Sequence, residues 1–140
     1  MRIAIIYWSG TGNTESMAEL IAEGARSTGA EVDLLPVDQS DVQVIEKYDR
    51  FAFGCPSEGD EELEETEFLP FFEQIERKLT GRKVALFGAY GWGDGQWMRD
   101  WQERVIALQA DLFEKGLAIQ EDSLPETEMC KSFGERFAKS

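Results

Sequence analysis

The sequence has no histidine, and its two cysteines, Cys55 and Cys130, lie far apart without a Cys-x-x-Cys pair. A zinc site built from cysteine and histidine is therefore excluded, and two distant thiols do not indicate a disulfide framework. The simplest interpretation is that both are free thiols, buried or half-buried, in a reducing compartment. Cysteine usage thus predicts a cytoplasmic protein, and the residue types predict no metal site.

Long apolar runs are also missing, because none approaches the roughly 20 residues that a membrane-spanning helix needs. The opening apolar run meets Ser9-Gly10 before any small-residue cleavage site, so we expect no secretory signal. A length of 140 residues suits one domain, and a hydrophobic content of 42% is enough for a core. We therefore expect residues 1–140 to form a single domain, monomeric and not associated with membranes.

Basic residues are scarce: 14 lysines and arginines stand against 28 acids, which gives a net charge of −14. Such a chain repels nucleic acid and anionic lipid, whose binding depends on positive charge. It attracts proteins with basic faces and speeds encounter with them. The acidity could equally serve solubility alone, and the net charge by itself does not separate the two interpretations.

Apolar runs alternate with amphipathic stretches along the whole chain. Strands are predicted at residues 3–8, 32–35, 51–54, 83–88 and 117–119. Helices are predicted at residues 13–28, 41–46, 66–79, 96–115 and 127–139. This alternation predicts an α/β fold with a parallel sheet covered by helices on both faces. Ligands of such sheets bind beyond the carboxyl ends of the strands, which draws attention to the loops after Trp8, Gly54 and Gly88.

The loop after the first strand runs Ser-Gly-Thr-Gly-Asn-Thr over residues 9–14 and opens a helix. Glycines allow a tight turn, and the free amides at a helix start bind anions. A nucleotide-binding P-loop is excluded because no Gly-Lys-Ser/Thr follows, and a dinucleotide fingerprint fails because Glu15 occupies the place of its third glycine. The loop suits one phosphate monoester bound by neutral donors, although a plain capped turn remains an alternative.

The loop after the third strand is acidic. Seven of the ten residues from Glu58 to Glu67 are carboxylates, and Gly59 between Glu58 and Asp60 predicts a tight turn. A solvated loop leading into a helix explains some of these acids, because acids favour a helix amino terminus. It does not explain why they gather at the ligand-binding edge of the sheet.

The loop after the fourth strand, Tyr-Gly-Trp-Gly-Asp-Gly over residues 90–95, alternates glycine with other residues. It should be neither helix nor regular strand, and it holds Trp92 at the ligand edge. A flat aromatic side chain there can stack on a flat ligand, although Trp92 could instead fold back onto the core. A phosphate cradle, a polar turn and an aromatic plate together predict flavin mononucleotide (FMN), a planar ring system with one phosphate.

The same residues resemble the flavodoxin family, and in particular its short-chain type from clostridia and related anaerobes such as Megasphaera. The resemblance covers essentially the whole chain. It rests on Tyr-Trp-Ser-Gly-Thr-Gly-Asn-Thr-Glu at 7–15, Gly-Cys-Pro at 54–56, and Ala-Leu-Phe-Gly-Ala-Tyr-Gly-Trp-Gly-Asp-Gly at 85–95. It implies a five-stranded parallel sheet in the order 2-1-3-4-5 within a three-layer sandwich.

By this resemblance the cofactor site combines the three loops. Ser9, Thr11, Gly12, Asn13 and Thr14 would hold the phosphate, residues 56–61 would line one side of the flavin, and Tyr90, Gly91 and Trp92 would line the other. Glu61 would bond the pyrimidine edge, and the carbonyl of Gly59 would turn toward the flavin on one-electron reduction. The full predicted site is Ser9, Gly10, Thr11, Gly12, Asn13, Thr14, Pro56, Ser57, Glu58, Gly59, Asp60, Glu61, Ala89, Tyr90, Gly91, Trp92 and Gly93.

Two residues depart from the family pattern. Glu58 stands where a methionine is usual, so either its side chain turns to solvent or it disfavours the fully reduced flavin. Ala89 stands where a serine is common, which removes one hydroxyl near the site. Neither change removes a phosphate donor, so the expectation of FMN is unaffected.

The resemblance implies a low-potential one-electron carrier that uses the semiquinone/hydroquinone couple of FMN. Its partners would be basic-faced redox proteins, such as ferredoxin or flavodoxin reductases and pyruvate oxidoreductase-type enzymes. The alternative is a flavin-dependent reductase or activator enzyme, which would need a substrate pocket beyond the flavin. A phospho-receiver domain is disfavoured because no paired acids follow the first strand, and a cysteine phosphatase because no arginine follows Cys55 nearby.

Overall fold

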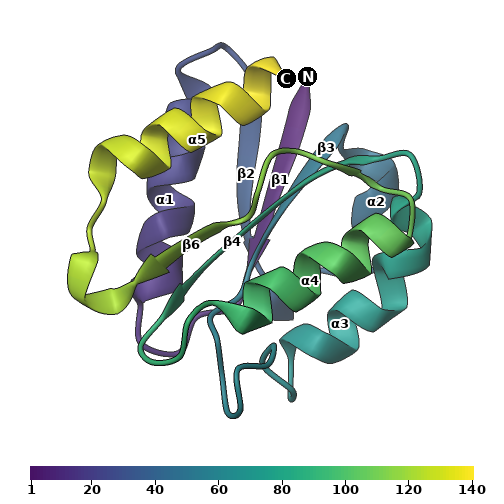
Figure 1. Ribbon diagram of the computed structural model, residues 1–140. Helices are drawn as coiled ribbons and strands as arrows, with labels where there is room; N and C mark the ends of the chain where they lie inside the picture. Colours follow the sequence, from purple (N-terminus) through teal and green to yellow (C-terminus); the bar gives the residue numbers. More distant parts are fainter.

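A parallel sheet lies between two layers of helices in the computed structural model, which describes residues 1–140 (Figure 1). The strands are β1 (Arg2–Tyr7), β2 (Glu31–Pro36), β3 (Arg50–Gly54), β4 (Lys83–Tyr90), β5 (Asp111–Leu112) and β6 (Leu117–Gln120). Their order is β2-β1-β3-β4-β5, and β6 also pairs with β4. The predicted fold class and the strand order 2-1-3-4-5 are confirmed.

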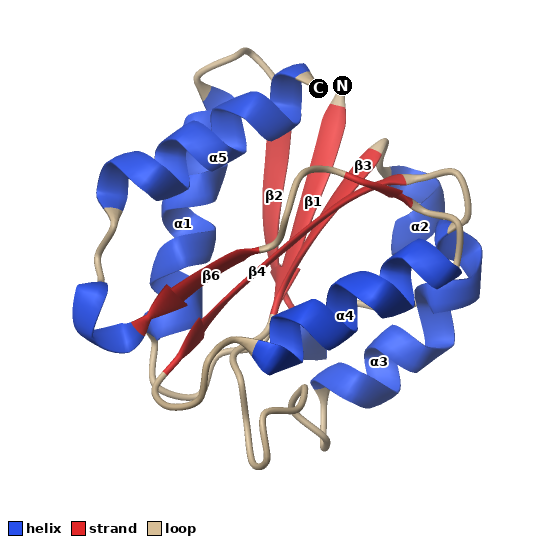
Figure 2. Ribbon diagram, viewed as in Figure 1, coloured by secondary structure: helices blue, strands red, loops and turns tan.

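The helices cover both faces of the sheet (Figure 2). On one face lie α1 (Asn13–Arg26) and α5 (Thr127–Lys139), and on the other lie α2 (Val44–Lys47), α3 (Phe68–Ile75) and α4 (Gln96–Ala107). Short 3₁₀ turns follow β2, α3 and β6, at Val37–Gln39, Glu76–Leu79 and Glu121–Ser123. No helix combines the length and the apolar character that crossing a membrane requires.

Two hydrophobic cores fill the spaces between the sheet and its helices. Along β1, Ile3 and Ile5 point into the core beneath α1 and α5, whereas Ala4 and Ile6 point into the core beneath α3 and α4. All four side chains are fully buried. Because successive residues of a strand point to opposite faces, a strand covered on both sides must be apolar throughout. This explains the continuous apolar run at the start of the sequence.

The predicted helix at 96–115 is wrong in its second half. Helix α4 ends at Ala107, Gln109 adopts a left-handed φ of 61°, and Asp111–Leu112 forms β5. The backbone of β5 pairs with Lys83 and Val84 of β4, and the Lys83 amine lies 3.1 Å from the Asp111 carboxylate. The apolar spacing of Leu108 and Leu112 suggested that the helix continues, but edge pairing with β4 determines the conformation.

The fifth position of the sheet is therefore shared by two short strands. β5 pairs with the start of β4, and β6 pairs with its end, from Phe87 to Tyr90. The prediction of one strand at 117–119 located β6 and missed β5. Because β6 pairs with the carboxyl end of β4, the segment that follows β6 and begins at Glu121 lies at the carboxyl edge of the sheet.

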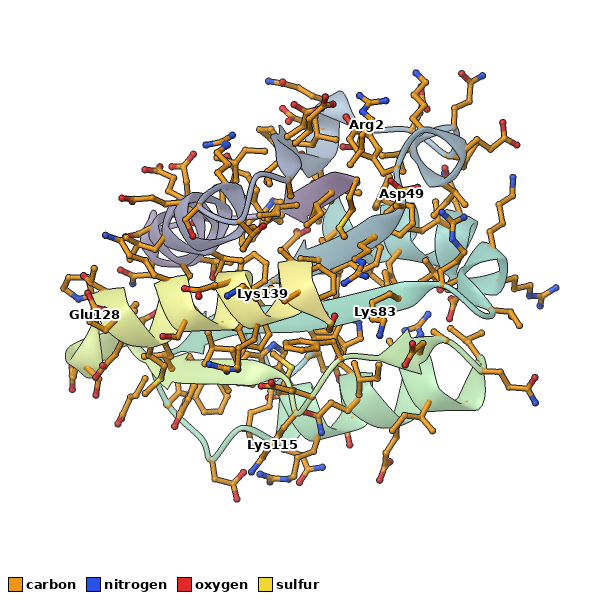
Figure 3. The ribbon with its side chains drawn as sticks, turned by 90° about the horizontal axis from the view of Figure 1, so that it is seen from above. Arg2, Asp49, Lys83, Lys115, Glu128 and Lys139 are labelled. Atoms are coloured by element: carbon orange, nitrogen blue, oxygen red, sulfur yellow. The ribbon has the colours of Figure 1, made fainter.

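The amino edge of the sheet lies at the end opposite the ligand loops. Charged side chains project around the molecule when it is seen from above, with Arg2 and Asp49 close to each other (Figure 3). The backbone N–H of Arg2 donates to the Asp49 carboxylate at 2.8 Å, and the Arg2 guanidinium lies 4.7 Å from the ring centroid of Tyr48. These contacts fix the amino-terminal end of β1. Its carboxyl end continues into the first of the three loops.

Candidate functional site

Three loops meet beyond the carboxyl ends of β1, β3 and β4, at the lower end of the view in Figure 1. They comprise residues 8–12, 55–67 and 91–95. The register of the sheet places Tyr7 beside Gly54 and Gly54 beside Phe87, so the three loops leave the sheet side by side. The sequence-based expectation that these loops share one edge is confirmed.

The first loop is organised by two hydroxyl groups. The Oγ of Ser9 accepts hydrogen bonds from the backbone N–H groups of Gly12 and Glu15, at 3.1 and 3.2 Å. The Oγ1 of Thr14 is buried and accepts a hydrogen bond from the backbone N–H of Ala89 at 3.3 Å. Neither hydroxyl donates a hydrogen bond within the protein. Ser9 and Thr14 thus shape the loop as well as offering donors.

Backbone donors converge on the same loop. The N–H groups of Gly10 and Thr11 meet no acceptor within the protein. Those of Asn13 and Thr14 lie in the first turn of α1, where the helix itself supplies no acceptor. Such a set of amides, with the positive end of the helix dipole behind it, binds an anion.

A small cavity of about 70 Å³ adjoins these amides. It combines residues of the first loop with Pro56, Glu58 and Ala89, all of which the sequence analysis places at the site. It also includes Trp8 and Glu121, which the sequence analysis does not. Glu121 directly follows β6, so applying the carboxyl-end rule to the fifth strand would have found it.

The acidic turn folds as a tight loop with its own backbone pairing. The N–H of Glu58 donates to the carbonyl of Glu62, and the N–H of Glu62 donates to the carbonyl of Glu58, both at 2.8 Å. Between them, Gly59 has a φ of 52° and Glu61 a φ of 58°, in the left-handed region that favours glycine. The predicted tight turn at Gly59 is confirmed.

The carboxylate of Glu61 joins the second loop to the third. It accepts hydrogen bonds from the backbone N–H groups of Asp94 and Gln96, each at 3.2 Å, and lies against Gly93. A side chain at Gly93 would collide with this carboxylate. Glu61 therefore has a structural role at the start of α4, in addition to any contact with a ligand.

Glu64 is buried and caps α3, unlike the other acids of the run. Its carboxylate accepts hydrogen bonds from the backbone N–H groups of Thr66, Glu67 and Phe68, at 2.8–2.9 Å, and from the Thr66 hydroxyl. Burial alone would raise its pKa, but the hydroxyl and the three amides outweigh burial and hold the pKa below its usual range. The sequence analysis did not single out Glu64 from the other acids of the run, because nothing in the local sequence marks it as the buried one.

Glu58 behaves differently, although it belongs to the same turn. Partial desolvation of its carboxyl, followed by the negative charges of Glu64 and Glu121, raises its pKa above the ordinary value. The residue is largely exposed, yet it lines the small cavity. Of the two orientations considered for Glu58, exposure favours the outward one.

The third loop presents Trp92 to solvent, with 58% of its surface exposed. The alternative in which Trp92 folds back onto the core is therefore excluded. Tyr90, before the loop, is half-buried against Trp97, with ring centroids 5.5 Å apart. Gly91 lies beside the Glu121 carboxylate, which would be 3.1 Å from a side-chain carbon at that position. An open aromatic face thus stands at the edge where the amides converge.

The residues present fit FMN. The buried hydroxyl oxygen of Ser57, which lies between Pro56 and Glu58 in the second loop, has no hydrogen-bond partner within the protein. Buried polar groups are nearly always paired, so this oxygen is one that a bound polar ligand would satisfy. Neutral donors suit a single phosphate, and the free face of Trp92 suits a planar ring. The two cysteines play no visible part, because both are buried free thiols, as predicted, and burial raises the pKa of each.

Comparison with known proteins agrees with this geometry. The sequence pattern of the flavodoxin family matches residues 5–134. The chain is 46% identical to the flavodoxin of Clostridium beijerinckii, over 96% of this chain and 97% of that one. It is 41% identical to the flavodoxin of Megasphaera elsdenii, over 99% of both. The solution structure of two-electron reduced M. elsdenii flavodoxin superposes with a TM-score of 0.89, at 40% identity and 99% coverage of both chains.

Proposed function

We propose that the three carboxyl-edge loops of this chain form an FMN site. The chain belongs to the flavodoxin family and is an FMN-containing, low-potential electron carrier rather than an enzyme. The observation that carries the proposal is the convergence of unpaired loop amides with the exposed face of Trp92 on one edge. When bound, FMN supplies a ring that takes up and releases electrons. The protein supplies binding, orientation and charge.

The phosphate is assigned to the first loop. The amides of Gly10, Thr11, Asn13 and Thr14 donate to it, together with the hydroxyl groups of Ser9, Thr11 and Thr14. Gly12 completes the turn before α1. Because no lysine or arginine lies in this loop, the phosphate charge is met by dipoles alone, which suits a monoester and disfavours a polyphosphate.

The ring is assigned to the space between the second and third loops. Pro56, Ser57, Glu58, Gly59, Asp60 and Glu61 form one wall, and Ala89, Tyr90, Gly91, Trp92 and Gly93 form the other. The unpaired hydroxyl of Ser57 and the exposed indole of Trp92 support this assignment. The bond network between Glu61 and the third loop holds the two walls together.

The acids around the ring keep the potential low. A carboxylate about 4 Å from a developing negative charge opposes it by roughly 1 kcal/mol in water and about 4 kcal/mol at an effective dielectric of 20. Asp60, Glu62 and Glu65 have no lysine or arginine partner in the structure. In our proposal the carbonyl of Gly59 would be free to turn toward the ring and accept a hydrogen bond from it, and such a bond would favour uptake of a single electron.

The partners of the protein are redox proteins. We assign these to basic-faced ferredoxin or flavodoxin reductases and pyruvate oxidoreductase-type enzymes, because the net charge is −14 and the acids gather at the site. Residues 1–140 act as one monomeric, FMN-binding domain in the cytoplasm. Electron transfer to such partners slows as salt rises, because salt screens the attraction between the charged faces.

Titration of the cofactor-free protein with FMN and with riboflavin tests the site. We expect one FMN per chain and at least tenfold weaker binding of riboflavin, which lacks the phosphate, because several hydrogen bonds of about 0.5–1.5 kcal/mol each are lost. Tryptophan fluorescence should be quenched by both ligands at saturation. Equal affinities for FMN and riboflavin would remove the phosphate assignment, and a protein that binds neither would contradict the proposal as a whole.

A further inference from the structure

The small cavity beside the first loop, of about 70 Å³, has two carboxylates in its walls. Glu58 reaches it from the acidic turn, and Glu121 from the segment after β6. The Glu121 carboxylate also lies beside Gly91, so it stands where the first loop and the third loop adjoin. No lysine or arginine lines this cavity. A site assigned to an anion thus contains two like charges and no cation.

Neither of these carboxylates has a partner within the protein. No donor binds the side chain of Glu58 or of Glu121, and neither residue takes part in an ion pair. Glu61 and Glu64 of the same turn differ, because backbone N–H groups donate to the carboxylates of both. Glu58 and Glu121 are exposed, so water alone solvates their charges.

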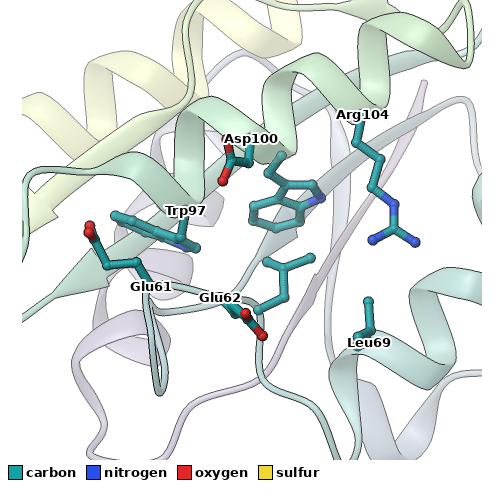
Figure 4. A pocket seen from close by; sticks show the side chains of 8 residues that line it. Glu61, Glu62, Leu69, Trp97, Asp100 and Arg104 are labelled. Carbon is teal, nitrogen blue, oxygen red and sulfur yellow. The ribbon is translucent and has the colours of Figure 1, made fainter.

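A larger cavity, of about 220 Å³, lies on the α4 side of the acidic turn and takes up other acids of that turn (Figure 4). Glu61 and Glu62 line it, and its one cation is Arg104. Two hydrogen bonds, of 2.6 and 2.9 Å, tie the Arg104 guanidinium to Glu76. This cation is therefore occupied elsewhere and does not offset the charge of the small cavity.

The charges that act on Glu58 are all negative. Partial desolvation raises the pKa of its carboxyl, and the charges of Glu64 in the same turn and of Glu121 after β6 raise it further. The first loop and Ala89, which complete the cavity walls, carry no ionisable side chain. The nearby Cys55 thiol stays neutral, because burial raises its pKa. Further negative charge in this cavity therefore favours the protonated form of Glu58.

We propose that Glu58 and Glu121 together take up a proton when FMN binds, so that the affinity for FMN rises as the pH falls. The inference rests on the proposed function, because it concerns the charge of the proposed FMN site. A phosphate monoester on the first loop adds negative charge beside both carboxylates, and a ligand in the cavity displaces water that solvates them. Repulsion between like charges that share a site is relieved when one of them is protonated, and the proton then belongs to the pair.

Protonation of the pair and binding of FMN favour each other. The FMN-bound protein holds more protons on Glu58 and Glu121 than the free protein does, so a lower pH stabilises the bound form. A whole proton taken up would strengthen binding about tenfold per pH unit. Because both residues are exposed in the free protein, we expect a smaller gain, of about two- to fivefold between pH 7 and pH 5.5. Since a methionine is usual at the position of Glu58 in the family, the pair is a feature of this chain.

Calorimetric titration with FMN at pH 6, in two buffers that differ in protonation enthalpy, measures the protons taken up on binding. EDTA is present throughout, so that no divalent cation replaces the proton. Because the phosphate itself titrates at about pH 6, the reference is the double variant Glu58→Gln with Glu121→Gln, in which that contribution remains. We expect the unmodified protein to take up more protons than the double variant and to gain more affinity from pH 7 to pH 5.5. Equal proton uptake by the two proteins contradicts the proposal.

Further variants separate the pair from net charge. The control combines Glu46→Gln with Glu103→Gln, which removes two exposed charges from α2 and α4, and it should keep the proton uptake of the unmodified protein. Glu58→Gln and Glu121→Gln alone should each lose most of the uptake, because the proton belongs to the pair. Full uptake in either single variant, or a loss in the control as large as in the double variant, would overturn the assignment to these two residues.

The carboxyl ¹³C signals of Glu58 and Glu121 give a second readout, which needs no variant and does not depend on affinity. When the protein is loaded with FMN, the midpoint of their titration should move up by about 0.5–1 pH unit. An unmoved midpoint in a chain that binds FMN refutes proton uptake by the pair, while the proposed function stands. Failure of the unmodified chain to bind FMN refutes the proposed function instead.

Discussion

The hydroxyl oxygen of Thr14 accepts a hydrogen bond from the backbone N–H of Ala89, 75 residues further along the chain, at 3.3 Å. This bond ties the start of α1 to the end of β4. It couples the loop assigned to the phosphate with the loop that carries Trp92. The geometry of the cofactor site therefore depends on the contact between Thr14 and Ala89, as well as on the conformation of each loop.

Replacement of Thr14 by valine should weaken FMN binding by about tenfold, because the change removes one donor to the phosphate and leaves the Ala89 amide unpaired. Riboflavin binding should change less, because riboflavin has no phosphate. Fluorescence titration of both ligands measures the difference. Thr28→Val is the matched control, since the Thr28 hydroxyl bonds the Ala25 carbonyl at the other end of α1. An equal loss for both ligands would count against a phosphate role for Thr14.

Gly93→Ala should impair FMN binding as well as stability. Gly93 has a φ of 85°, and an added carbon there collides with the Glu61 carboxylate that joins the two ring loops. Gly29→Ala is the control, because Gly29 has a φ of 94° but open space around it. Both variants should lose about 1 kcal/mol of unfolding free energy from backbone strain. Urea unfolding and FMN titration together should show weakened binding only in Gly93→Ala.

Glu64→Gln should lower stability at neutral pH and much less in acid. The pKa of Glu64 is lower in the folded protein than its ordinary value of 4.5, so its ionised form stabilises the fold above about pH 4.5. That contribution is lost as the pH falls through the lowered folded pKa. We expect a cost of about 1–3 kcal/mol at pH 7, as for hydrogen bonds to a charged group.

Urea unfolding from pH 7 down to pH 3 measures this difference. The control is Glu65→Gln, because Glu65 is exposed and neighbours Glu64 in sequence. A difference between Glu64→Gln and the unmodified protein that stayed constant across this range would show that the ionised carboxylate is not the stabilising group.

Neutralising the solvated acids of the turn should raise the potential of the second electron-uptake step by about 20–60 mV, because each 1.4 kcal/mol corresponds to 59 mV for one electron. The variant combines Asp60→Asn, Glu62→Gln and Glu65→Gln. A control with the same change in net charge, distant from the site, combines Glu23→Gln, Glu31→Gln and Glu46→Gln. Spectroelectrochemical titration at low and high salt compares them, and equal shifts in both variants would assign the effect to net charge alone.

Much of the fold and of the site could be predicted from local sequence patterns. The strands β1, β3 and β4 are continuous apolar runs because both of their faces are covered. The loops at the site can be recognised by their high glycine content. Since parallel strands end on the same edge, the three loops could be brought together without coordinates. Those loops predicted FMN, and the resemblance that they carry implied the family and the role of electron carrier; the relatives confirm all three.

Other features depended on contacts between distant residues, which local patterns do not contain. The end of α4 at Ala107 is set by the pairing of Asp111 and Leu112 with β4, against an apolar spacing that favoured more helix. Glu64 and Glu65 are neighbours of the same residue type, yet only Glu64 turns inward to cap α3.

The sequence by itself determined the order of the strands and helices other than β5, the edge at which the loops meet and the chemistry that those loops can offer. The periodicity of apolar residues and the conformational freedom of glycine are properties of short segments, so they can be recognised without a structure. Only the tertiary structure decided which carboxylate is buried and how Glu61 joins two loops. Each of these depends on which surfaces meet when the helices pack on the sheet.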